Sequence, residues 1–244
     1  MVDKPAKRAD QLGHRPKRFW KEVTVTQGLG IALDGRPVKT PSGAHLVLPV
    51  HALAHPVAAE WAAVGEHVDY DAMPLTRLGF AAIDRMPDIR DEIVTEVLRY
   101  AETDLICYPS EYPESLIARE AQAWDPILLW ASEELDLVFY QNLTLTHQAQ
   151  PAQTTDRLRA LVLAMTPHEQ AGLMTAIPLL GSVVLALALW RGRLGGEDAF
   201  AAATVGETFQ AGIWGQDAEA EERRNGMKAR AVSLETWFGA LRKT

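Results

Sequence analysis

The strongest hydrophobic pattern in the chain is the run Ala171–Trp190, which extends for twenty residues without a charged side chain. A run of this length matches what a membrane-spanning helix requires, so a bilayer span is one interpretation. Thr166-Pro167-His168-Glu169 stands just upstream and has the form of a capping box with proline at the first helical position. Because Gly181 and Ser182 lie in mid-run and suit close approach of neighbours, we favour a single buried helix at the centre of a helical bundle.

The pattern from Arg18 to Pro49 is different and predicts short strands separated by turns. Residues 19–25 alternate as a half-buried strand does, and Asp34-Gly35 is a strong hairpin signal. With a fourth strand over His45–Leu48, the stretch predicts an antiparallel β-meander. So small a sheet needs a cover on one face.

The expected cover is an alanine-rich helix over Val50–Val64, which carries Trp61. Pro56 lies inside this helix, and we expect a kink or a restart there because proline removes a backbone donor. No strand pattern follows Leu75, so the chain predicts an α+β fold. We expect a flexible N-terminal arm over residues 1–17, a β-rich domain over 18–80 and a larger all-helical domain over 81–244.

Helix starts and breaks in the second part of the chain are marked by caps, prolines and glycines. Asp88 is expected to cap one helix, and Asp125-Pro126 is expected to start another. A helix with three-four apolar spacing is expected from Thr155, and Gly195-Gly196 is expected to separate the central run from a helix over Ala199–Trp214. An amphipathic helix should close the chain through Leu234, Trp237, Phe238 and Leu241.

Composition and charge narrow the classes of function. The 244 residues are 48% hydrophobic and 23% charged with a net charge of −8, which disfavours nucleic acid as a partner because lysine and arginine cluster only in the first twenty residues. A single cysteine, Cys107, indicates a reducing compartment. The basic N-terminus has no apolar run after it, so we expect no secretory signal and place the protein in a bacterial cytoplasm.

No catalytic, cofactor or metal signature is found in the sequence, which has no phosphate-binding glycine loop, nucleophile elbow or zinc pattern. His51 and His55 could share a metal, but two ligands do not make a site. Cys107 could act as a nucleophile near a histidine, although a small packed core residue is the favoured interpretation. Asp104 is expected to cap a helix or to pair with an arginine. We therefore expect no catalytic residue, no cofactor and no metal.

The sharpest surface feature is the acidic tract Gln216–Glu222, which Arg223-Arg224 follows. One interpretation is a solvated helix face whose charges suit the helix dipole. The other is an acidic edge that steers a basic partner. Most of the seven tryptophans should lie in the core, but Trp124, Trp130 and Trp214 stand beside polar turns, where an aromatic side chain can anchor an interface.

Several short motifs occur in an order that resembles one protein family. They are Arg18-Phe19-Trp20-Lys21, the hairpin Leu33–Pro41, Glu60-Trp61, Met73-Pro74-Leu75-Thr76, Thr103–Tyr108, Pro113-Glu114-Ser115-Leu116, Trp124-Asp125-Pro126-Ile127, Trp130-Ala131, Glu207-Thr208-Phe209-Gln210 and Trp214-Gly215. Together they resemble the assembly chaperones that hold the alpha subunit of the F-type ATP synthase catalytic sector.

The resemblance implies a small β-rich N-terminal domain, a larger helical C-terminal domain, and binding without catalysis. The implied partner is the unassembled alpha subunit, whose apolar surface the chaperone covers until the beta subunit replaces it. An essential acidic residue near the C-terminus is associated with the family. Glu207, Glu219 and Glu221 are the candidates, and the sequence does not choose between them.

The candidate client-binding set carried by these motifs is Glu207, Gln210, Trp214, Gly215, Glu219, Glu221, Trp124 and Asp125. We also expect no nucleic acid partner, no integral membrane insertion and a monomer when free. For eukaryotic relatives we expect the mitochondrial matrix as the location. The alternative from another class is a soluble enzyme of unknown reaction that uses an acidic cleft between the domains.

Overall fold

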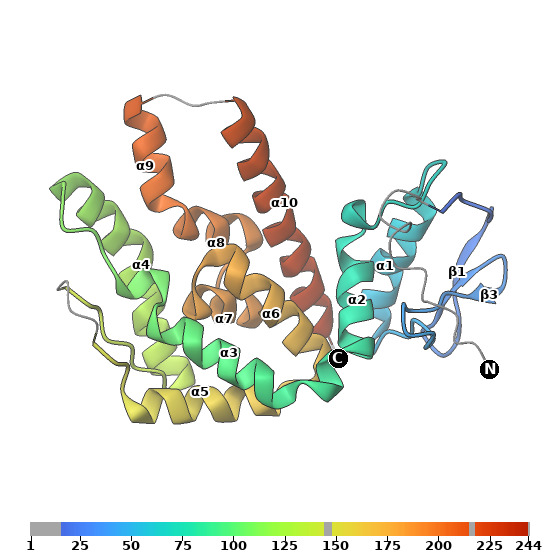
Figure 1. Ribbon diagram of the computed structural model, residues 1–244, viewed down its shortest axis with the longest axis horizontal. Helices are drawn as coiled ribbons and strands as arrows, with labels where there is room; N and C mark the ends of the chain where they lie inside the picture. Colours follow the sequence, from blue (N-terminus) through green and yellow to red (C-terminus); the bar gives the residue numbers. More distant parts are fainter. Residues whose placement is uncertain (1–15, 144–147, 215–217, 244) are drawn as a thin grey trace, which may run out of the picture.

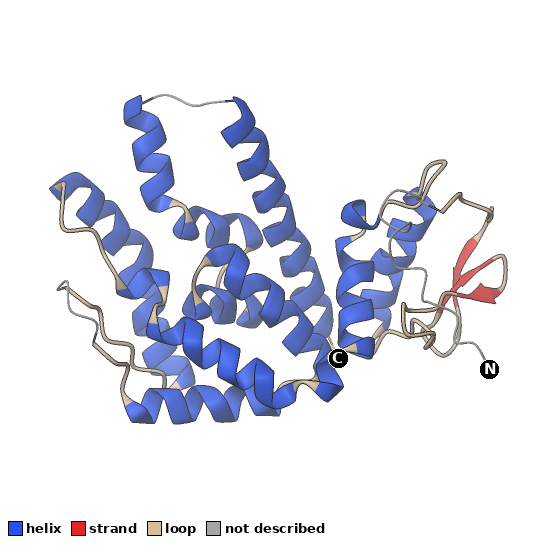
Figure 2. Ribbon diagram, viewed as in Figure 1, coloured by secondary structure: helices blue, strands red, loops and turns tan. Residues whose placement is uncertain are grey.

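The computed structural model describes residues 16–143, 148–214 and 218–243. A small antiparallel sheet lies at one end and a larger helical body at the other, with α1 (His51–Ala63) and α2 (Pro74–Asp84) between them (Figures 1 and 2). Past Leu75 no strand occurs in the described residues. The predicted α+β class is confirmed, whereas the division into domains at residue 80 stays a prediction.

The sheet has three strands, β1 (Val23–Val25), β2 (Ile31–Leu33) and β3 (Arg36–Pro37), in that order and antiparallel. Asp34 and Gly35 form the β2–β3 turn with positive φ angles of 47° and 76°, as the hairpin signal predicts.

The predicted fourth strand is wrong. Residues 45–48 make only isolated bridges, Lys39 with His45 and Gly30 with Val47. Leu46 accepts from the Ile31 N–H and donates to the Val38 carbonyl, so this segment contacts two parts of the sheet instead of running along one strand.

Helix α1 covers the sheet as expected. Leu53, Val57 and Trp61 are buried, and the Trp20 indole N–H donates to the Trp61 carbonyl at 3.3 Å. The expected restart at Pro56 is wrong, because α1 runs unbroken through that residue. Burial of its apolar side chains outweighs the one backbone hydrogen bond that proline removes.

The helical body packs around α6 and α7, which contact α2, α3, α8 and α10. Three single-turn helices lie between longer ones: η1 (Tyr70–Ala72) between α1 and α2, η2 (Met86–Asp88) after α2, and η3 (Leu105–Cys107) before α4. The helices after α2 are α3 (Arg90–Glu102), α4 (Glu114–Leu135), α5 (Ala152–Ala164), α6 (Pro167–Leu180), α7 (Val183–Arg191), α8 (Gly196–Ala203), α9 (Val205–Trp214) and α10 (Ala218–Leu241).

The central apolar run is two helices, so the prediction of one continuous helix is wrong. Gly181 ends α6 with a φ of 65°, and the Ser182 hydroxyl oxygen accepts from the Leu185 N–H at 3.0 Å to cap α7. The predicted capping box at Thr166 and Glu169 is confirmed. The predicted burial of the run is confirmed for residues 183–190, all of which are buried, but not for the whole of α6, where Thr175 and Pro178 are exposed. Across the described ranges no helix has the length and apolar character needed to cross a bilayer.

A buried carboxylate closes the joint between α6 and α7. Asp104 Oδ2 accepts from the Val183 and Val184 N–H groups at 2.7 and 3.1 Å, and its Oδ1 accepts from the Ile106 N–H at 3.2 Å. Asp104 therefore caps η3 and α7 together, which confirms the expectation of a cap. Burial raises the pKa of Asp104 to about 6, against the lowering effect of these donors.

Three expected helix starts differ from the structure. Asp88 lies in η2 and does not cap α3, whose N-cap is Ile89. Helix α4 runs through Pro126 without a new start, because Trp124 and Ile127 continue one buried face across it. Helix α5 begins at Ala152, three residues before Thr155.

The expected helix over Ala199–Trp214 is also wrong, because it is split between α8 and α9. The Thr204 hydroxyl donates to the Phe200 carbonyl at 2.9 Å at this break. The glycines at 195 and 196 mark the start of α8, as the expected break requires.

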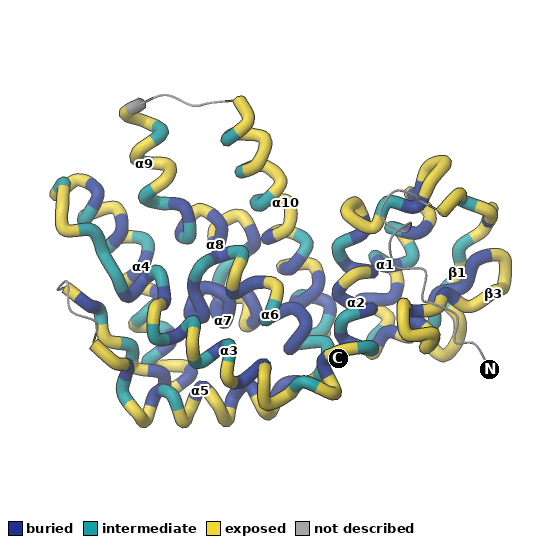
Figure 3. Tube along the Cα trace, viewed as in Figure 1, coloured by how far each residue is buried: buried dark blue, intermediate teal, exposed yellow. Residues whose placement is uncertain are grey.

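Helix α10 closes the body with its second half only. Trp237 and Phe238 are fully buried, and a side chain at Gly172 would come within 2.5 Å of the Phe238 ring. The predicted C-terminal amphipathic helix is thereby confirmed. From Ala218 to Arg230, by contrast, α10 carries no buried residue (Figure 3).

Replacement of the buried cap should destabilise the fold. Asp104→Ala leaves three buried backbone N–H groups without acceptors, so we expect the free energy of unfolding to fall by about 3 kcal/mol. Urea denaturation followed by circular dichroism measures it. Asp156→Ala, which removes an exposed carboxylate, is the matched control and should change stability by less than about 0.5 kcal/mol. Equal losses in the two variants would contradict the role of Asp104.

His168 should make the fold sensitive to acid. Its ring stacks on Trp237 at 6.0 Å, and burial lowers its pKa to about 4 from 6.5. The unfolded chain binds this proton at higher pH than the folded chain, so stability is lost as pH falls from about 6.5 to about 4. The loss should approach about 3 kcal/mol.

Comparison with His168→Phe isolates this effect, since phenylalanine keeps the ring on Trp237 and cannot be protonated. Between pH 7 and pH 4, the unfolding free energy of the natural chain should fall more than that of the variant. Urea titrations at several pH values measure that difference. A difference that stays constant with pH rules the explanation out.

Candidate functional site

Helices α9 and α10 stand on either side of α8 and project beyond the body (Figure 1). Helix α9 packs on α4, and α10 packs on α8 through the second half of its length. The first thirteen residues of α10, Ala218–Arg230, have no buried member. We call α9 together with Ala218–Arg230 the crest.

A groove of about 500 Å³ lies at the base of the crest. Its lining comes from α4, α8, α9 and α10, and consists of Arg119, Glu197, Asp198, Phe200, Ala201, Thr204, Val205, Thr208, Arg224 and Lys228. Charged groups of both signs therefore surround a partly apolar floor.

Exposed polar contacts cross this groove. The Arg224 guanidinium donates to the Thr208 hydroxyl at 2.8 Å, and Lys228 Nζ lies 3.0 Å from a Glu197 carboxylate oxygen. Exposed pairs of this kind contribute little to stability. A partner that enters the groove can replace them at small cost.

Of the predicted residues on the crest, four have described side chains. Glu207 and Gln210 are exposed on α9, and Glu219 and Glu221 are exposed in the first turn of α10. The structure thus places the three candidate acids on the two helices that flank the groove. Trp214 ends α9, but its side chain, like Gly215 and the tract residues Gln216 and Asp217, falls outside the described residues.

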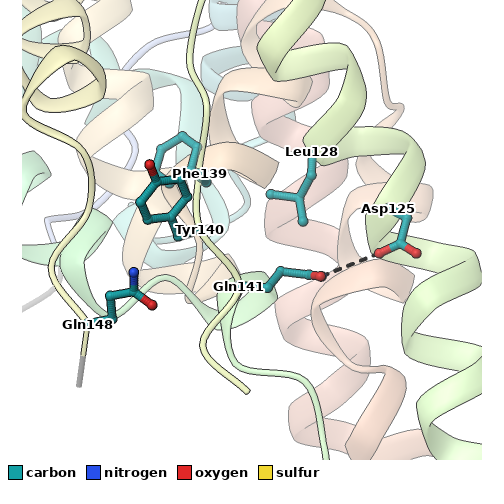
Figure 4. A pocket seen from close by; sticks show the side chains of 6 residues that line it. All are labelled: Asp125, Leu128, Phe139, Tyr140, Gln141 and Gln148. Carbon is teal, nitrogen blue, oxygen red and sulfur yellow. Dashed lines mark hydrogen bonds between the residues drawn. The ribbon is translucent and has the colours of Figure 1, made fainter. Parts of the chain in front are cut away.

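The other two predicted residues lie elsewhere, on α4, and face different surroundings. Trp124 is 3% exposed, and its indole N–H donates to the Ala202 carbonyl at 2.8 Å. It therefore ties α4 to the end of α8 and presents little surface to a partner. Asp125 is exposed and accepts from the Gln141 side chain at 3.3 Å in a separate pocket (Figure 4).

The sequence prediction missed the residues that build the groove. The Arg119 guanidinium lies 5.2 Å from the Phe209 ring centre, so a cation–π contact joins α4 to α9. Ile213 is 58% exposed near the end of α9. The available signal was the spacing of Val205, Phe209 and Ile213, which puts them on one helix face.

The residues considered for chemistry do not form a reactive site. Burial and the Asp104 charge raise the pKa of the Cys107 thiol, which disfavours the thiolate that a nucleophile needs. The favoured interpretation of Cys107 as a packed core residue agrees with its burial. The His51 and His55 rings stack at 6.3 Å, and the described residues hold no cluster of three or more metal-ligating side chains.

Trp124 should behave as a support of the crest. Trp124→Phe removes the donor to the Ala202 carbonyl, so we expect the free energy of unfolding to fall by about 1–3 kcal/mol. Trp130→Phe is the matched control in the same helix, because Trp130 is only half-buried and its indole has no hydrogen bond in the described structure. Urea denaturation compares the two. A loss in the control as large as in Trp124→Phe would contradict the supporting role.

Comparison with known proteins gives consistent results. Residues 17–132 match the family described as ATP12 chaperone protein. The chain is 26% identical to the mitochondrial protein atp12 of Schizosaccharomyces pombe over 224 residues, which cover 86% of this chain and 77% of that protein.

Solved structures extend the comparison to the fold. The crystal structure of Atp12 from Paracoccus denitrificans is 34% identical with a TM-score of 0.84, covering 92% of this chain and 98% of that one. A putative chaperone from Agrobacterium tumefaciens is 37% identical with a TM-score of 0.85, covering 93% and 86%.

These matches confirm the resemblance seen in the sequence motifs, and with it the prediction of a chaperone and not an enzyme. The identity to the Paracoccus structure, over nearly the whole of both chains, carries the assignment. This chain belongs to the ATP12 chaperone family.

Proposed function

We propose that this chain binds the unassembled alpha subunit of the F-type ATP synthase and promotes assembly of the catalytic sector. The observation that supports this location is the crest, where none of thirteen consecutive residues of α10 is fully buried. Most helical stability in proteins comes from packing of one face. A helix that projects without such packing is suited to receive a partner.

The chemistry of the crest fits a reversible hold on a client. Ile213 and the half-buried Phe209 supply apolar area, and the groove floor adds Phe200 and Val205. Glu207, Glu219 and Glu221 form a rim that can steer a basic surface of the client toward this apolar area. Gln210, Trp214 and Gly215 complete the proposed contact set, with Trp124 as a support beneath it.

The place of action and the free state are also proposals. The bacterial relatives support a bacterial cytoplasm, and the name of the Schizosaccharomyces pombe relative supports mitochondria for eukaryotic relatives. The free protein is expected to be monomeric, since the proposed partner of the crest is a different chain, the alpha subunit. The net charge of −8 agrees with a partner other than nucleic acid.

Charge reversal of the rim should weaken client binding without unfolding the chaperone. We expect Glu207→Lys, Glu219→Lys or Glu221→Lys to weaken alpha-subunit retention by about tenfold or more, because the rim would then repel a basic client surface. The measurement is recovery of coexpressed alpha subunit on a tagged chaperone. Glu22→Lys, exposed at the far end of the molecule, is the matched control.

Circular dichroism of each variant separates binding from folding. Surface acids contribute little to stability, so helical content should stay unchanged. Lost helical signal in a rim variant would show that the acid is structural. Full retention of the alpha subunit by all three variants would rule out the crest as its binding surface.

A further inference from the structure

A second surface lies on α4, away from the groove, where the chain returns after the helix. Asp136 ends α4 in the left-handed conformation with a φ of 56°, and residues 137–143 then run back beside it in extended form. The Leu137 N–H donates to the Ala131 carbonyl, and Gln141 reaches Asp125. Residues of α4 and of the extended segment line a pocket of about 490 Å³ that is open to solvent (Figure 4).

One side of the extended segment is closed by side chains that imitate a neighbouring strand. The Gln150 side-chain oxygen accepts from the Tyr140 N–H at 2.8 Å, and the Gln150 amide donates to the Tyr140 carbonyl at 3.1 Å. The Thr154 hydroxyl donates to the Val138 carbonyl at 2.6 Å. Residues 138 and 140 therefore have their carbonyl groups satisfied from one side.

The alternate residues are open. Within the described chain, the backbone N–H and C=O groups of Phe139 and Gln141 have no hydrogen-bond partner, and both residues line the pocket. Successive residues of a strand direct these groups to opposite sides. An unpaired strand edge of this kind is a template for one more strand.

Both α4 and the extended segment carry large exposed apolar side chains. Leu129 on α4 is 58% exposed, and Leu143 is 72% exposed at the end of the extended segment. Val138 and Tyr140 are also large and exposed. Leu128, Phe139 and Tyr140 line the pocket beside the edge, and apolar groups of this kind are typical of interaction surfaces.

The charge around the edge is mostly negative, with one guanidinium beside it, because Arg157 Nε donates to the Leu135 carbonyl at 3.0 Å next to Asp136. From Glu120 to Asp156 the chain has six acidic residues and no lysine or arginine. Asp125 and Glu133 lie one turn before and one turn after Leu129 on the same face of α4, and both are exposed, as is Asp136. Neither Asp125, Glu133 nor Asp136 forms an ion pair within the described ranges.

We propose that residues 137–143 accept an extended segment of the client by addition of a β-strand, and that this segment alternates apolar residues with lysine or arginine. Backbone hydrogen bonds to Phe139 and Gln141 would give affinity, while the exposed leucines and acids would select the side chains. The inference rests on the proposed function for the identity of the client. It adds a second contact, separate from the crest.

A short peptide tests the strand edge without the alpha subunit. The probe is a fluorescein-labelled nine-residue peptide of alternating valine and lysine, capped at both ends, added to the full chain. We expect saturable binding by fluorescence anisotropy and slower hydrogen exchange at the Phe139 and Gln141 amides. The same peptide with glutamate for lysine, or with N-methyl groups along one edge, should bind about tenfold more weakly or worse.

Variants locate the binding on this surface. Glu133→Lys combined with Asp136→Lys should weaken binding of the valine-lysine peptide by about tenfold. Glu22→Lys, on the exposed surface at the sheet end of the molecule, is the matched control and should leave peptide binding unchanged. Equal binding of the glutamate peptide, or unchanged exchange at Phe139 and Gln141, would overturn the proposal. So would a concentration-dependent dimer in sedimentation that the double variant abolishes, because the occupant would then be a second copy of the chain.

Retention of the alpha subunit by the same variants separates this inference from the proposed function. If the alpha subunit is retained but the peptide does not bind, the strand edge fails and the chaperone function stands. If the peptide binds at Phe139 and Gln141 but no alpha subunit is recovered, the proposed client fails. Weaker retention by the double variant, with unchanged circular dichroism, would support both.

Discussion

The structure depends on the burial of α7 on all sides. Every residue from Val183 to Trp190 is buried, so the amides at the start of this helix have no access to water. Asp104, brought from a segment some eighty residues away in the chain, supplies the acceptor that these amides need. Burial of the Asp104 carboxylate is unfavourable and raises its pKa. Unpaired amides in the core would cost more free energy than this burial. The joint between α6 and α7 thereby fixes the orientation of both helices.

The rest of the body follows from that centre. Helices α6 and α10 meet closely at Gly172, where the absence of a side chain leaves room for the Phe238 ring. Helix α8 approaches α10 as closely, because a side chain at Gly196 would come within 2.5 Å of the Ala231 carbonyl. These contacts use the second half of α10 alone, so its first half extends past the core. The crest therefore results from the positions of Gly172 and Gly196, which let α6 and α8 approach only the second half of α10.

Two surfaces of different character result from this arrangement. The crest has charges of both signs over an apolar floor, whereas the open edge of residues 137–143 is apolar and acidic. A chaperone needs to hold a client firmly enough to cover apolar area and loosely enough to release it. Several moderate contacts on separate surfaces achieve this better than one large buried interface, because each can be displaced in turn.

Local patterns determined much of this protein. Asp34-Gly35 specified the hairpin, Thr166 and Glu169 specified the start of α6, and the spacing of Leu234, Trp237 and Phe238 specified the buried face of α10. The order of short motifs was enough to indicate the family. Each of these features is encoded within a few residues, where propensity and periodicity act directly.

Only the tertiary structure decided where local signals are overridden. Pro56 and Pro126 lie inside unbroken helices because buried faces continue across them, and Gly181 divides an apolar run that periodicity alone reads as one helix. The dual role of Asp104 and the groove between α9 and α10 join segments far apart in the chain. Trp124 and Asp125 are adjacent in sequence, yet one is buried and the other exposed. The physical reason is that burial and hydrogen bonding depend on which distant segments meet, and no local pattern contains that information.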